Sequence, residues 1–287
     1  MSATARAGSG EHAAAAATGA RAARRGPAVK ARLSRLGPPL VLVLVLLGAW
    51  ELYAEVSGVQ PELLPAPHEV ASAIWHGGAV LWRNFAVTAE EVVLGVGLAL
   101  AGGFALGVAM HLWPPLRRAA YPLAVGSQAV PIPVIGVLLV FWLGFGIFPK
   151  LVVIALICFF PVLVTTVDAL AAVDRDQLKL MRTLDASRWQ AFRLAELPAA
   201  LPAALSGARV ALAVGVIGAF IAEVATPTTG TYPGLGRQIM SDVNLQAARA
   251  YAGTVVLVVF ALVCFHSLAL AERRLAPWRG RPTGDSQ

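Results

Sequence analysis

Runs of apolar residues long enough to cross a lipid bilayer are the feature that most limits how this chain can fold. A membrane-spanning helix needs about 20 consecutive, mainly apolar residues. Because backbone polar groups inside a bilayer must be satisfied within the protein, such runs span it as helices. Six runs meet the requirement and predict an all-α membrane protein with six transmembrane helices. Their approximate ranges are 38–58, 87–110, 119–143, 149–171, 204–224 and 251–272.

The composition supports the same class of protein. Hydrophobic residues make up 57% of the chain and charged residues 14%, which excludes an ordinary soluble globular protein. The net charge of +7 would suit nucleic acid, but the basic residues are spread over tails and loops without an aromatic-basic cluster for bases to stack on. Nucleic acid is therefore not expected as a partner. Cys158 and Cys264 fall inside apolar runs and are expected to be small core residues.

The distribution of Lys and Arg predicts the orientation in the membrane. With the N-terminus in the cytoplasm, all but four of the 23 basic residues lie in inner loops and tails. The exceptions are Arg83, Lys150, Arg237 and Arg249. Both termini are thus predicted to be cytoplasmic. The expected organisation is a disordered basic tail (1–36), a first helix with an outer amphipathic segment (37–86), a core (87–272) that contains a cytoplasmic loop (172–203), and a cytoplasmic tail (273–287).

The longest polar interruption of the apolar part runs from residue 174 to 202. Trp189 and Phe192 are three residues apart and would share one helical face. The helix is expected to stop at Leu197-Pro198, because the residue before a proline disfavours helical geometry. An amphipathic helix with an aromatic stripe would suit a groove on a partner. The alternative is a solvated loop whose arginines only fix topology, and residue types alone slightly favour it.

The spacing within this stretch resembles a known loop. Permeases of ABC importers carry a cytoplasmic loop of the form Glu-Ala-Ala, three residues, Gly, nine residues, Ile, one residue, Leu-Pro. The run MRTLDASRWQAFRLAELPAALP is similar to that loop in the nitrate, sulfonate, taurine and thiamine-precursor group. Residues 179–181 depart from Glu-Ala-Ala, Asp185 stands at the glycine, and Ala195 stands at the isoleucine. Asp tolerates a left-handed turn better than most residues, so the turn is expected to survive.

The third apolar run is interrupted by Gln128, Pro131 and Pro133. Prolines in a spanning helix free backbone carbonyls, which is tolerated beside protein or a water-lined cavity. A position beside a translocation path and a kink needed only for packing explain these residues equally well. The strings SQAVPIP and LLVFWLGFGIFPKLVVIALICFFPVLV resemble the same permease group, most closely the branch that imports pyrimidine precursors of thiamine.

Acidic residues inside apolar runs usually face a bundle interior or a cavity. Glu223 lies near the outer end of the fifth run, where the resemblance also places an acidic residue, and it is predicted to act in the path or its gate. Asp168 is accommodated by the interface and nearby arginines. Glu90 and Glu91 open the second run and would suit either a cavity or the headgroup region.

Motifs for catalysis and for metal binding are missing from the sequence. It has no Gly-x-x-x-x-Gly-Lys-Ser/Thr phosphate loop and no arrangement of residues for nucleophilic or acid–base catalysis. His68 and His76 are eight residues apart without a third ligand nearby in sequence, so interface histidines are expected and a metal site is not. We therefore expect neither an enzyme nor a bound cofactor.

The resemblance implies a permease subunit in the cell membrane. Two copies, expected to be a homodimer, would enclose the path, two ATP-binding subunits would receive the cytoplasmic loops, and an extracytoplasmic solute-binding protein would deliver the substrate. Trp189 and Phe192 would anchor the ATP-binding subunit, since buried aromatics dominate such contacts. The expected coupling residues are Thr183, Leu184, Asp185, Ala186, Ser187, Arg188, Trp189, Phe192, Arg193, Leu197 and Pro198, and the expected path residues are Gln128, Pro131, Pro133 and Glu223.

A second class of transporter fits some of these features. Secondary transporters driven by an ion gradient often have broken helices in matching halves of an internal repeat. The proline-rich third run has no counterpart elsewhere in the chain, and this favours the ATP-driven importer. Nitrate, sulfonates, taurine and a thiamine-type pyrimidine all remain open as substrates, with the last preferred on resemblance.

Overall fold

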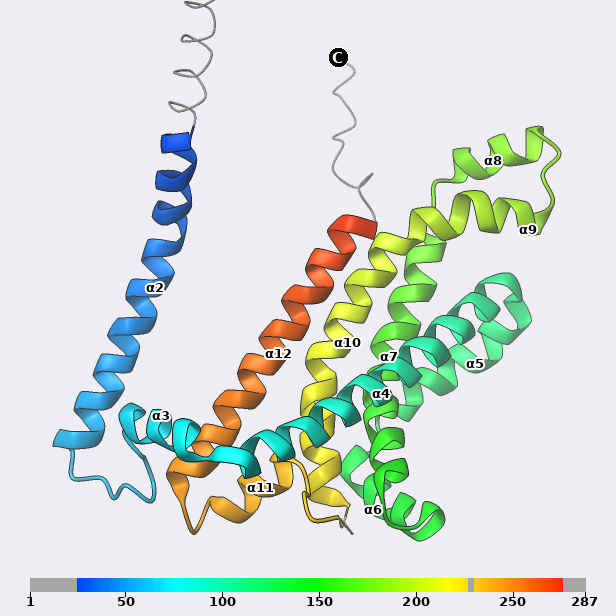
Figure 1. Ribbon diagram of the computed structural model, residues 1–287. Coiled ribbons are helices and arrows are strands. Elements are labelled where there is room, and N and C mark those ends of the chain that lie inside the picture. Colours follow the sequence, from blue (N-terminus) through cyan, green and yellow to red (C-terminus); the bar gives the residue numbers. More distant parts are fainter. Residues whose placement is uncertain (1–24, 227–229, 276–287) are drawn as a thin grey trace, which may run out of the picture. The chain divides into compact units, whose positions relative to one another are not determined.

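The computed structural model describes residues 25–226 and 230–275 (Figure 1). Every regular element in these two ranges is a helix, as the sequence predicts. The chain divides into two units, residues 1–68 and 69–287. The predicted cytoplasmic tail 276–287 and residues 1–24 of the predicted N-terminal tail lie outside the described residues.

The first unit contains α2 (Arg25–Val56). Its apolar part, Gly37–Val56, is 20 residues long, which matches the first predicted span, and all of it is accessible within the chain. The helix begins at Arg25, inside the stretch predicted to be disordered up to residue 36. Residues 25–36 contain Ala, Arg, Lys and Leu, all good helix formers, and Pro27 lies in the first turn, where proline is tolerated.

The second unit is built from four long helices and several shorter ones. The long helices are α4 (Gly78–Leu112), α7 (Ile147–Ala171), α10 (Leu197–Ala225) and α12 (Ala247–Leu275). The shorter elements are α5 (Pro114–Ser127), α6 (Ile132–Leu143), α8 (Arg175–Thr183), α9 (Arg188–Ala191), the π-helix η1 (Phe192–Glu196) and α11 (Leu235–Asp242), while α3 (Pro67–His76) lies at the boundary between the units. Four of the predicted spans therefore correspond to single long helices here.

The third predicted span, 119–143, is broken into two helices at the prolines that interrupt it in the sequence. α5 ends at Ser127, α6 begins at Ile132, and the two are bent by 101°. Pro131 occupies the N-cap of α6 with an extended backbone, and Pro133 follows directly in its first turn. Proline disfavours helical geometry in the residue before it and lacks an N–H, so the chain leaves α5 here and restarts. Five described helices are long enough to cross a membrane, and six if this bent pair counts as one span.

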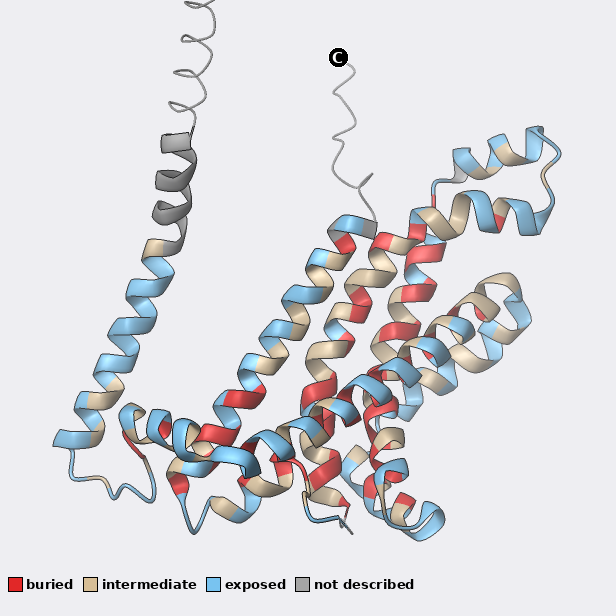
Figure 2. Cartoon of the chain, viewed as in Figure 1, coloured by how far each residue is buried: buried red, intermediate tan, exposed pale blue. Residues whose placement is uncertain are grey.

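The core of the second unit lies where α4, α7 and α10 cross (Figure 2). Glycines let the backbones approach closely, as is common between membrane helices. A Cβ atom at Gly95 of α4 would lie 2.7 Å from the Ile154 side chain of α7, and one at Gly103 would lie 2.9 Å from Val162 of α7. The same pattern recurs along the pair, so α4 and α7 are in close contact over much of their length.

The predicted helix stop at Leu197-Pro198 is also wrong. The helix continues from α9 through the π-helix η1 into α10, with Pro198 in the first turn of α10. The backbone N–H of Leu197 bonds to the carbonyl of Phe192, five residues back. This wider turn accommodates a residue that has no N–H and whose ring would clash with the carbonyl four residues earlier. The proline therefore produces a π-turn and does not end the helix.

Candidate functional site

A helical hairpin made of α8 and α9 connects α7 to α10. Figure 1 shows it extending beyond the ends of these two long helices. Asp174 begins α8 by accepting a hydrogen bond at 2.9 Å from the backbone N–H of Asp176. The side chain of Ser187 begins α9 in a capping box: its hydroxyl accepts from the N–H of Gln190, whose side chain accepts from the N–H of Ser187. Each helix of the hairpin thus begins at a side-chain N-cap of its own.

The turn between α8 and α9 is left-handed at Asp185, as the sequence predicts. Asp185 has φ 56° and is the one residue other than glycine with a positive φ in the described chain. The N–H of Ala186 bonds to the carbonyl of Met181, and the N–H of Asp185 bonds to that of Arg182, both at 3.0 Å. These two bonds make a Schellman motif, the commonest way to end a helix at a left-handed residue. The turn forms although the glycine of the related loops is absent.

The two aromatic residues of the hairpin stack on each other but are not equally accessible. The ring centroids of Trp189 and Phe192 are 5.4 Å apart, with 30° between the planes. Trp189 is 60% exposed, whereas Phe192 is 4% exposed and packs in a cluster with Ala169 and Leu170 of α7 and Ala200 of α10. Of the two predicted anchors, only Trp189 is available to a partner; Phe192 holds the hairpin to its own chain.

The surface of the hairpin is rich in exposed apolar side chains. Leu180, Leu184, Trp189 and Leu194 are each at least 60% exposed. Among the other predicted coupling residues, Thr183, Asp185, Ser187, Arg188 and Arg193 are exposed, while Ala186, Leu197 and Pro198 are half-buried. Three of these apolar side chains lie on the hairpin and Leu194 lies on η1, and exposed large apolar side chains of this kind suit contact with another protein.

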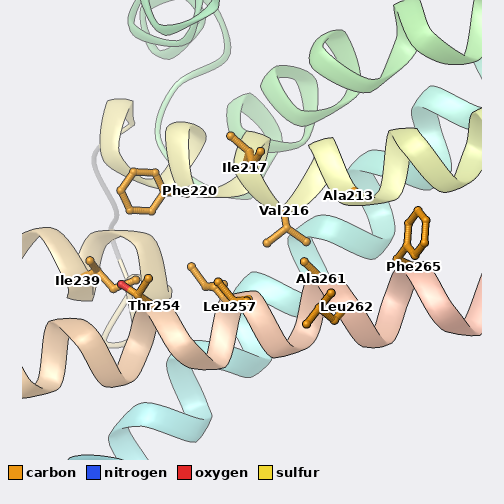
Figure 3. A pocket seen from close by; sticks show the side chains of 11 residues that line it. Ala213, Val216, Ile217, Phe220, Ile239, Thr254, Leu257, Ala261, Leu262 and Phe265 are labelled. Atoms are coloured by element: carbon orange, nitrogen blue, oxygen red, sulfur yellow. The ribbon is translucent and has the colours of Figure 1, made fainter. Parts of the chain in front are cut away.

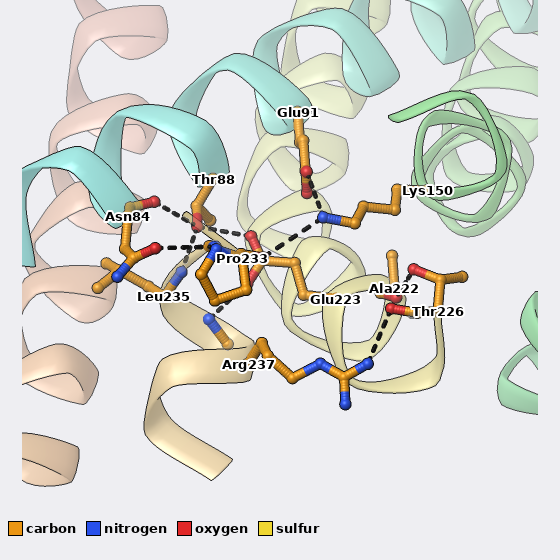
Figure 4. A network of polar contacts seen from close by, with 12 residues as sticks. Asn84, Thr88, Glu91, Lys150, Ala222, Glu223, Thr226, Pro233, Leu235 and Arg237 are labelled. Atoms are coloured by element: carbon orange, nitrogen blue, oxygen red, sulfur yellow. Dashed lines mark hydrogen bonds and ion pairs between the residues drawn. The ribbon is translucent and has the colours of Figure 1, made fainter. Parts of the chain in front are cut away.

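A second polar site surrounds Glu223, near the end of α10 (Figure 4). Glu223 is fully buried. Its carboxylate accepts a hydrogen bond at 2.6 Å from the Thr88 hydroxyl of α4 and another from the backbone N–H of Gly236 in α11. A Cβ atom at Gly234 or Gly236 would collide with this carboxylate, so both positions need glycine. The run Gly234-Leu235-Gly236 is therefore the part of the chain that encloses the Glu223 carboxylate.

Neighbouring residues extend this Glu223 network across four helices. Thr88 also accepts a hydrogen bond from the N–H of Leu235 at 2.8 Å, and Asn84 accepts one from the N–H of Gly234 at 3.1 Å. The side-chain amide of Asn84 donates to Gln238 at 2.8 Å. The network thus fixes the start of α11 onto α4 and α10. These hydrogen bonds give Glu223 a structural role, which is independent of the role in the translocation path predicted from the sequence.

A buried ion pair completes the network. The ammonium of Lys150, at the start of α7, lies 2.7 Å from a carboxylate oxygen of Glu91 on α4, and both side chains are at most 3% exposed. Lys150 also approaches the carbonyl of Pro233 at 3.4 Å. The sequence predicted that Lys150 lies on the outer side and left two positions open for Glu91, a cavity or the headgroup region. A charged residue within or at the edge of an apolar run was the only sign of this ion pair in the sequence, because the two residues are 59 positions apart.

The remaining predicted path residues lie elsewhere. Gln128, Pro131 and Pro133 are exposed at the bend between α5 and α6. Asp168, near the end of α7, is exposed, which agrees with the interface position expected for it. The structure therefore does not bring the three residues of the third run into the network around Glu223.

A hollow between α10 and α12 does not suit a polar solute (Figure 3). It has a volume of about 680 Å³, and ten of its eleven lining residues are apolar, among them Phe220 and Leu257. The exception is Thr254, whose hydroxyl donates to the carbonyl of Ala250. A groove of this chemistry within spanning helices matches lipid or another apolar surface, not a substrate site.

In the first unit, His68 has acidic neighbours that the sequence did not indicate. The ring and the backbone N–H of His68 both contact the carboxylate of Glu51, and ligand atoms of Glu51, Glu55 and His68 lie within 4.8 Å of one another. The carboxylate of Glu51 thereby caps the start of α3, which explains the arrangement without a metal ion.

Several apolar spans together with a projecting polar hairpin between two of them define a membrane protein of the transport-permease class. Residues 96–277 match the family described as "Binding-protein-dependent transport system inner membrane component". The chain belongs to that family.

Relatives among characterised proteins cover most of the chain. It is 31% identical over 245 residues to the formylaminopyrimidine transport permease protein ThiX of Halalkalibacterium halodurans, covering 84% of this chain and 95% of that protein. It is 30% identical over 244 residues to the taurine transport system permease protein TauC of Escherichia coli, covering 82% and 87%. Both relatives support the permease group named from the sequence.

Solved structures show the same fold. A chain of the MetNI methionine ABC transporter in an inward-facing conformation superimposes with a TM-score of 0.62 at 17% identity, covering 68% of this chain and 96% of that one. The helical arrangement is therefore that of an importer permease, with a further part of this chain outside the match.

Proposed function

We propose that this chain is the membrane-spanning permease subunit of an ATP-driven importer and forms the translocation path for a small polar or anionic solute. The observation that carries the proposal is the α8–α9 hairpin. It presents a capped, ordered and partly apolar surface at the position where the family places its contact with the ATP-binding subunit. A hairpin that only fixed membrane topology would not need three exposed large apolar side chains.

The contact with the ATP-binding subunit is centred on Trp189. Its indole is exposed and stacks on the ring of Phe192. Because Phe192 is itself buried, this stacking fixes the position of the indole. A pre-positioned aromatic side chain loses little conformational freedom on binding, and such residues dominate interface energies. Leu184 extends the apolar surface, and the charges of Arg188 and Arg193 surround it.

Energy for transport comes from partner subunits in this proposal. The sequence has no phosphate loop, so ATP is hydrolysed elsewhere, on two copies of an ATP-binding subunit. A second permease copy, giving a homodimer, completes the path, and an extracytoplasmic solute-binding protein supplies the substrate.

The substrate is proposed to be a pyrimidine precursor of the thiamine type. Support comes from the resemblance of the third and fourth runs, and from the relative named for formylaminopyrimidine transport. Relatives named for taurine and for riboflavin transport match at similar identity. Calorimetric titration of the cognate solute-binding protein with a formylaminopyrimidine, taurine and riboflavin separates the three, and binding of taurine alone would contradict the pyrimidine assignment.

The proposal is tested by purifying the tagged permease from its native membrane in mild detergent and identifying what accompanies it. We expect an ATPase with a phosphate loop. Trp189→Ala should lower the recovery of that ATPase about tenfold or more, the loss expected for a central aromatic anchor. Trp75→Ala removes a tryptophan that is 85% exposed on α3, outside the hairpin, and serves as the matched control, with unchanged recovery.

Two results would contradict the proposal. One is a permease that purifies alone while uptake in cells is intact. The other is uptake that is abolished by collapsing the proton gradient yet indifferent to ATP depletion, which would assign the chain to the secondary transporters.

A further inference from the structure

The helices α4 and α7 each have one end at the α8–α9 hairpin and the other end at the Glu223 network. We propose that they form a single unit that transmits movement of the hairpin to the Glu223 network, and that the contact between His111 and Glu196 is the joint that couples the α4 end of this unit to the base of the hairpin, while residues 172–174 connect its α7 end through the backbone. The inference rests on the proposed function, because the hairpin is moved by the ATP-binding subunit. It names positioning residues that lie outside the hairpin surface.

The joint lies at the base of the hairpin. His111 is in the last turn of α4, and Glu196 is the last residue of the π-helix η1. The Nε2 atom of His111 is 2.7 Å from a carboxylate oxygen of Glu196, and the two side chains are 20% and 14% exposed. A hydrogen bond to a carboxylate, largely shielded from water, is stronger than one between neutral groups at the surface. It links α4 to a segment 85 residues away in the sequence.

An aromatic contact reinforces the joint. The ring of Phe192 lies 6.4 Å from that of His111 and packs against Ala169 and Leu170 of α7. Its cluster also includes Val108 and Leu112 of α4. Phe192 therefore contacts both helices of the pair on one side and stacks on Trp189 on the other. A displacement of Trp189 by a bound subunit acts first on Phe192 and, through it, on α4 and α7.

The α4–α7 pair is packed too tightly to absorb such a displacement. At Gly95, Gly103 and Gly107 of α4, an added Cβ atom would lie 2.7–2.9 Å from side chains of α7. Close-packed interiors transmit strain and do not deform gradually. The two helices are therefore expected to move together.

The other end of the pair holds the Glu223 network. Asn84, Thr88 and Glu91 belong to α4, and Lys150 belongs to α7. At 1.5 Å per residue, Glu91 and His111 are about 30 Å apart along α4. Movement of the pair changes the position of the groups that hold the Gly-Leu-Gly segment and the start of α11.

The test uses the complete importer, with permease, ATP-binding subunits and solute-binding protein, in proteoliposomes. Its readout is the amount of substrate taken up for each ATP hydrolysed. His111→Ala should retain the ATPase during purification but lower uptake per ATP about tenfold, the change expected when a charge-assisted hydrogen bond of the coupling path is lost. His111→Gln should recover it to within about twofold, because the glutamine amide places a donor near the position of Nε2.

A second measurement follows the movement itself. Spin labels at Glu90→Cys on α4 and Leu245→Cys, just before α12, report distances beside the Glu223 network, in a background without native cysteines. Both positions are exposed. A nucleotide-dependent distance change should be present in the otherwise unmodified complex and in His111→Gln, and absent in His111→Ala.

Glu196→Gln is measured in parallel. It keeps the size of the side chain and removes the charge of the carboxylate, so it tests the joint even if His111→Ala fails to fold. It should lower uptake per ATP several-fold. Normal uptake per ATP and a normal distance change in both His111→Ala and Glu196→Gln, with the ATPase bound, would overturn the joint while leaving the proposed function intact. A complex from which the ATPase is missing even without substitutions would overturn the proposed function instead.

Discussion

At the scale of single residues, the structure separates side chains that face a partner from those that organise the chain. Trp189 and Phe192 look equivalent in the sequence, yet one is exposed and the other is buried. Asp185 is unusual for a different reason, since it holds a left-handed turn without being glycine. Each of these properties leads to a measurable effect.

Asp185→Gly should stabilise the hairpin turn by about 1 kcal/mol, because glycine adopts the left-handed region without the penalty paid by other residues. Hydrogen exchange of the amides in residues 184–186 is the measurement, and exchange should slow. Asp185→Ala, which keeps the penalty, is the control. Faster exchange in the glycine variant would show that the Asp185 side chain itself stabilises the turn.

Lys150→Met should destabilise the protein by about 3–5 kcal/mol, since it leaves the carboxylate of Glu91 buried without its partner. Adding Glu91→Leu should recover most of the loss, because a buried ion pair and a well-packed apolar pair are often of similar stability. The midpoint of thermal unfolding in detergent measures both. If the double variant is as unstable as the single one, the ion pair has a role beyond mutual neutralisation.

At the scale of elements, the close contact between α4 and α7 determines much of the architecture. Glycines occur on the face of α4 that meets α7 and also elsewhere on the helix. Only those facing α7 are needed for packing, since Gly97 has nothing within 4 Å of an added Cβ atom. The two kinds of glycine provide a matched comparison.

Gly103→Val should destabilise the second unit by about 1–3 kcal/mol, the usual cost of overpacking, because its Cβ atom would lie 2.9 Å from Val162. Gly97→Val, which adds the same side chain to an exposed position of the same helix, should change stability far less. Thermal unfolding in detergent compares them. Equal losses in the two variants would mean that helix propensity, not packing against α7, sets the effect.

At the scale of the whole molecule, the order of spans determines which segments share a side of the membrane. α7, α10 and α12 are three successive spans, with the hairpin between the first two and residues 226–246 between the last two. The hairpin and the C-terminal end of α12 must therefore lie on one side, and residues 226–246 on the other. We propose that the first side is the cytoplasmic one, because Lys and Arg are in excess near it.

Single cysteines at Leu184 and Arg274 should react with a membrane-impermeant thiol reagent in inside-out vesicles but not in intact cells. A cysteine at Gly230 should show the opposite pattern. The background carries Cys158→Ala and Cys264→Ala. Labelling of Leu184 and Arg274 from opposite sides would contradict the order of spans, and labelling of both from outside would reverse the orientation.

Much of this protein could be predicted from the sequence because the relevant information is local. Apolar run length predicts the spans, and the tolerance of Asp185 for a left-handed turn predicts the end of α8. The permease group follows from short strings that lie in these same segments. The prolines of the third run break the helix with a bend of 101°, but the helix stop predicted at Leu197-Pro198 failed, since Pro198 lies within a helix. A proline excludes one backbone hydrogen bond, but its surroundings decide whether the helix breaks or forms a π-turn.

The sequence by itself determined that the chain is a membrane protein with a polar segment between two spans, and through its resemblance to known loops that it is a permease, because each of those features needs only neighbouring residues. The tertiary structure alone decided which side chains of the hairpin are free, what surrounds Glu223, and how the hairpin is joined to α4. Those properties depend on pairs far apart in the chain, such as Glu91 with Lys150 and His111 with Glu196. No local pattern specifies such pairs, because burial and partner choice arise only when the helices pack.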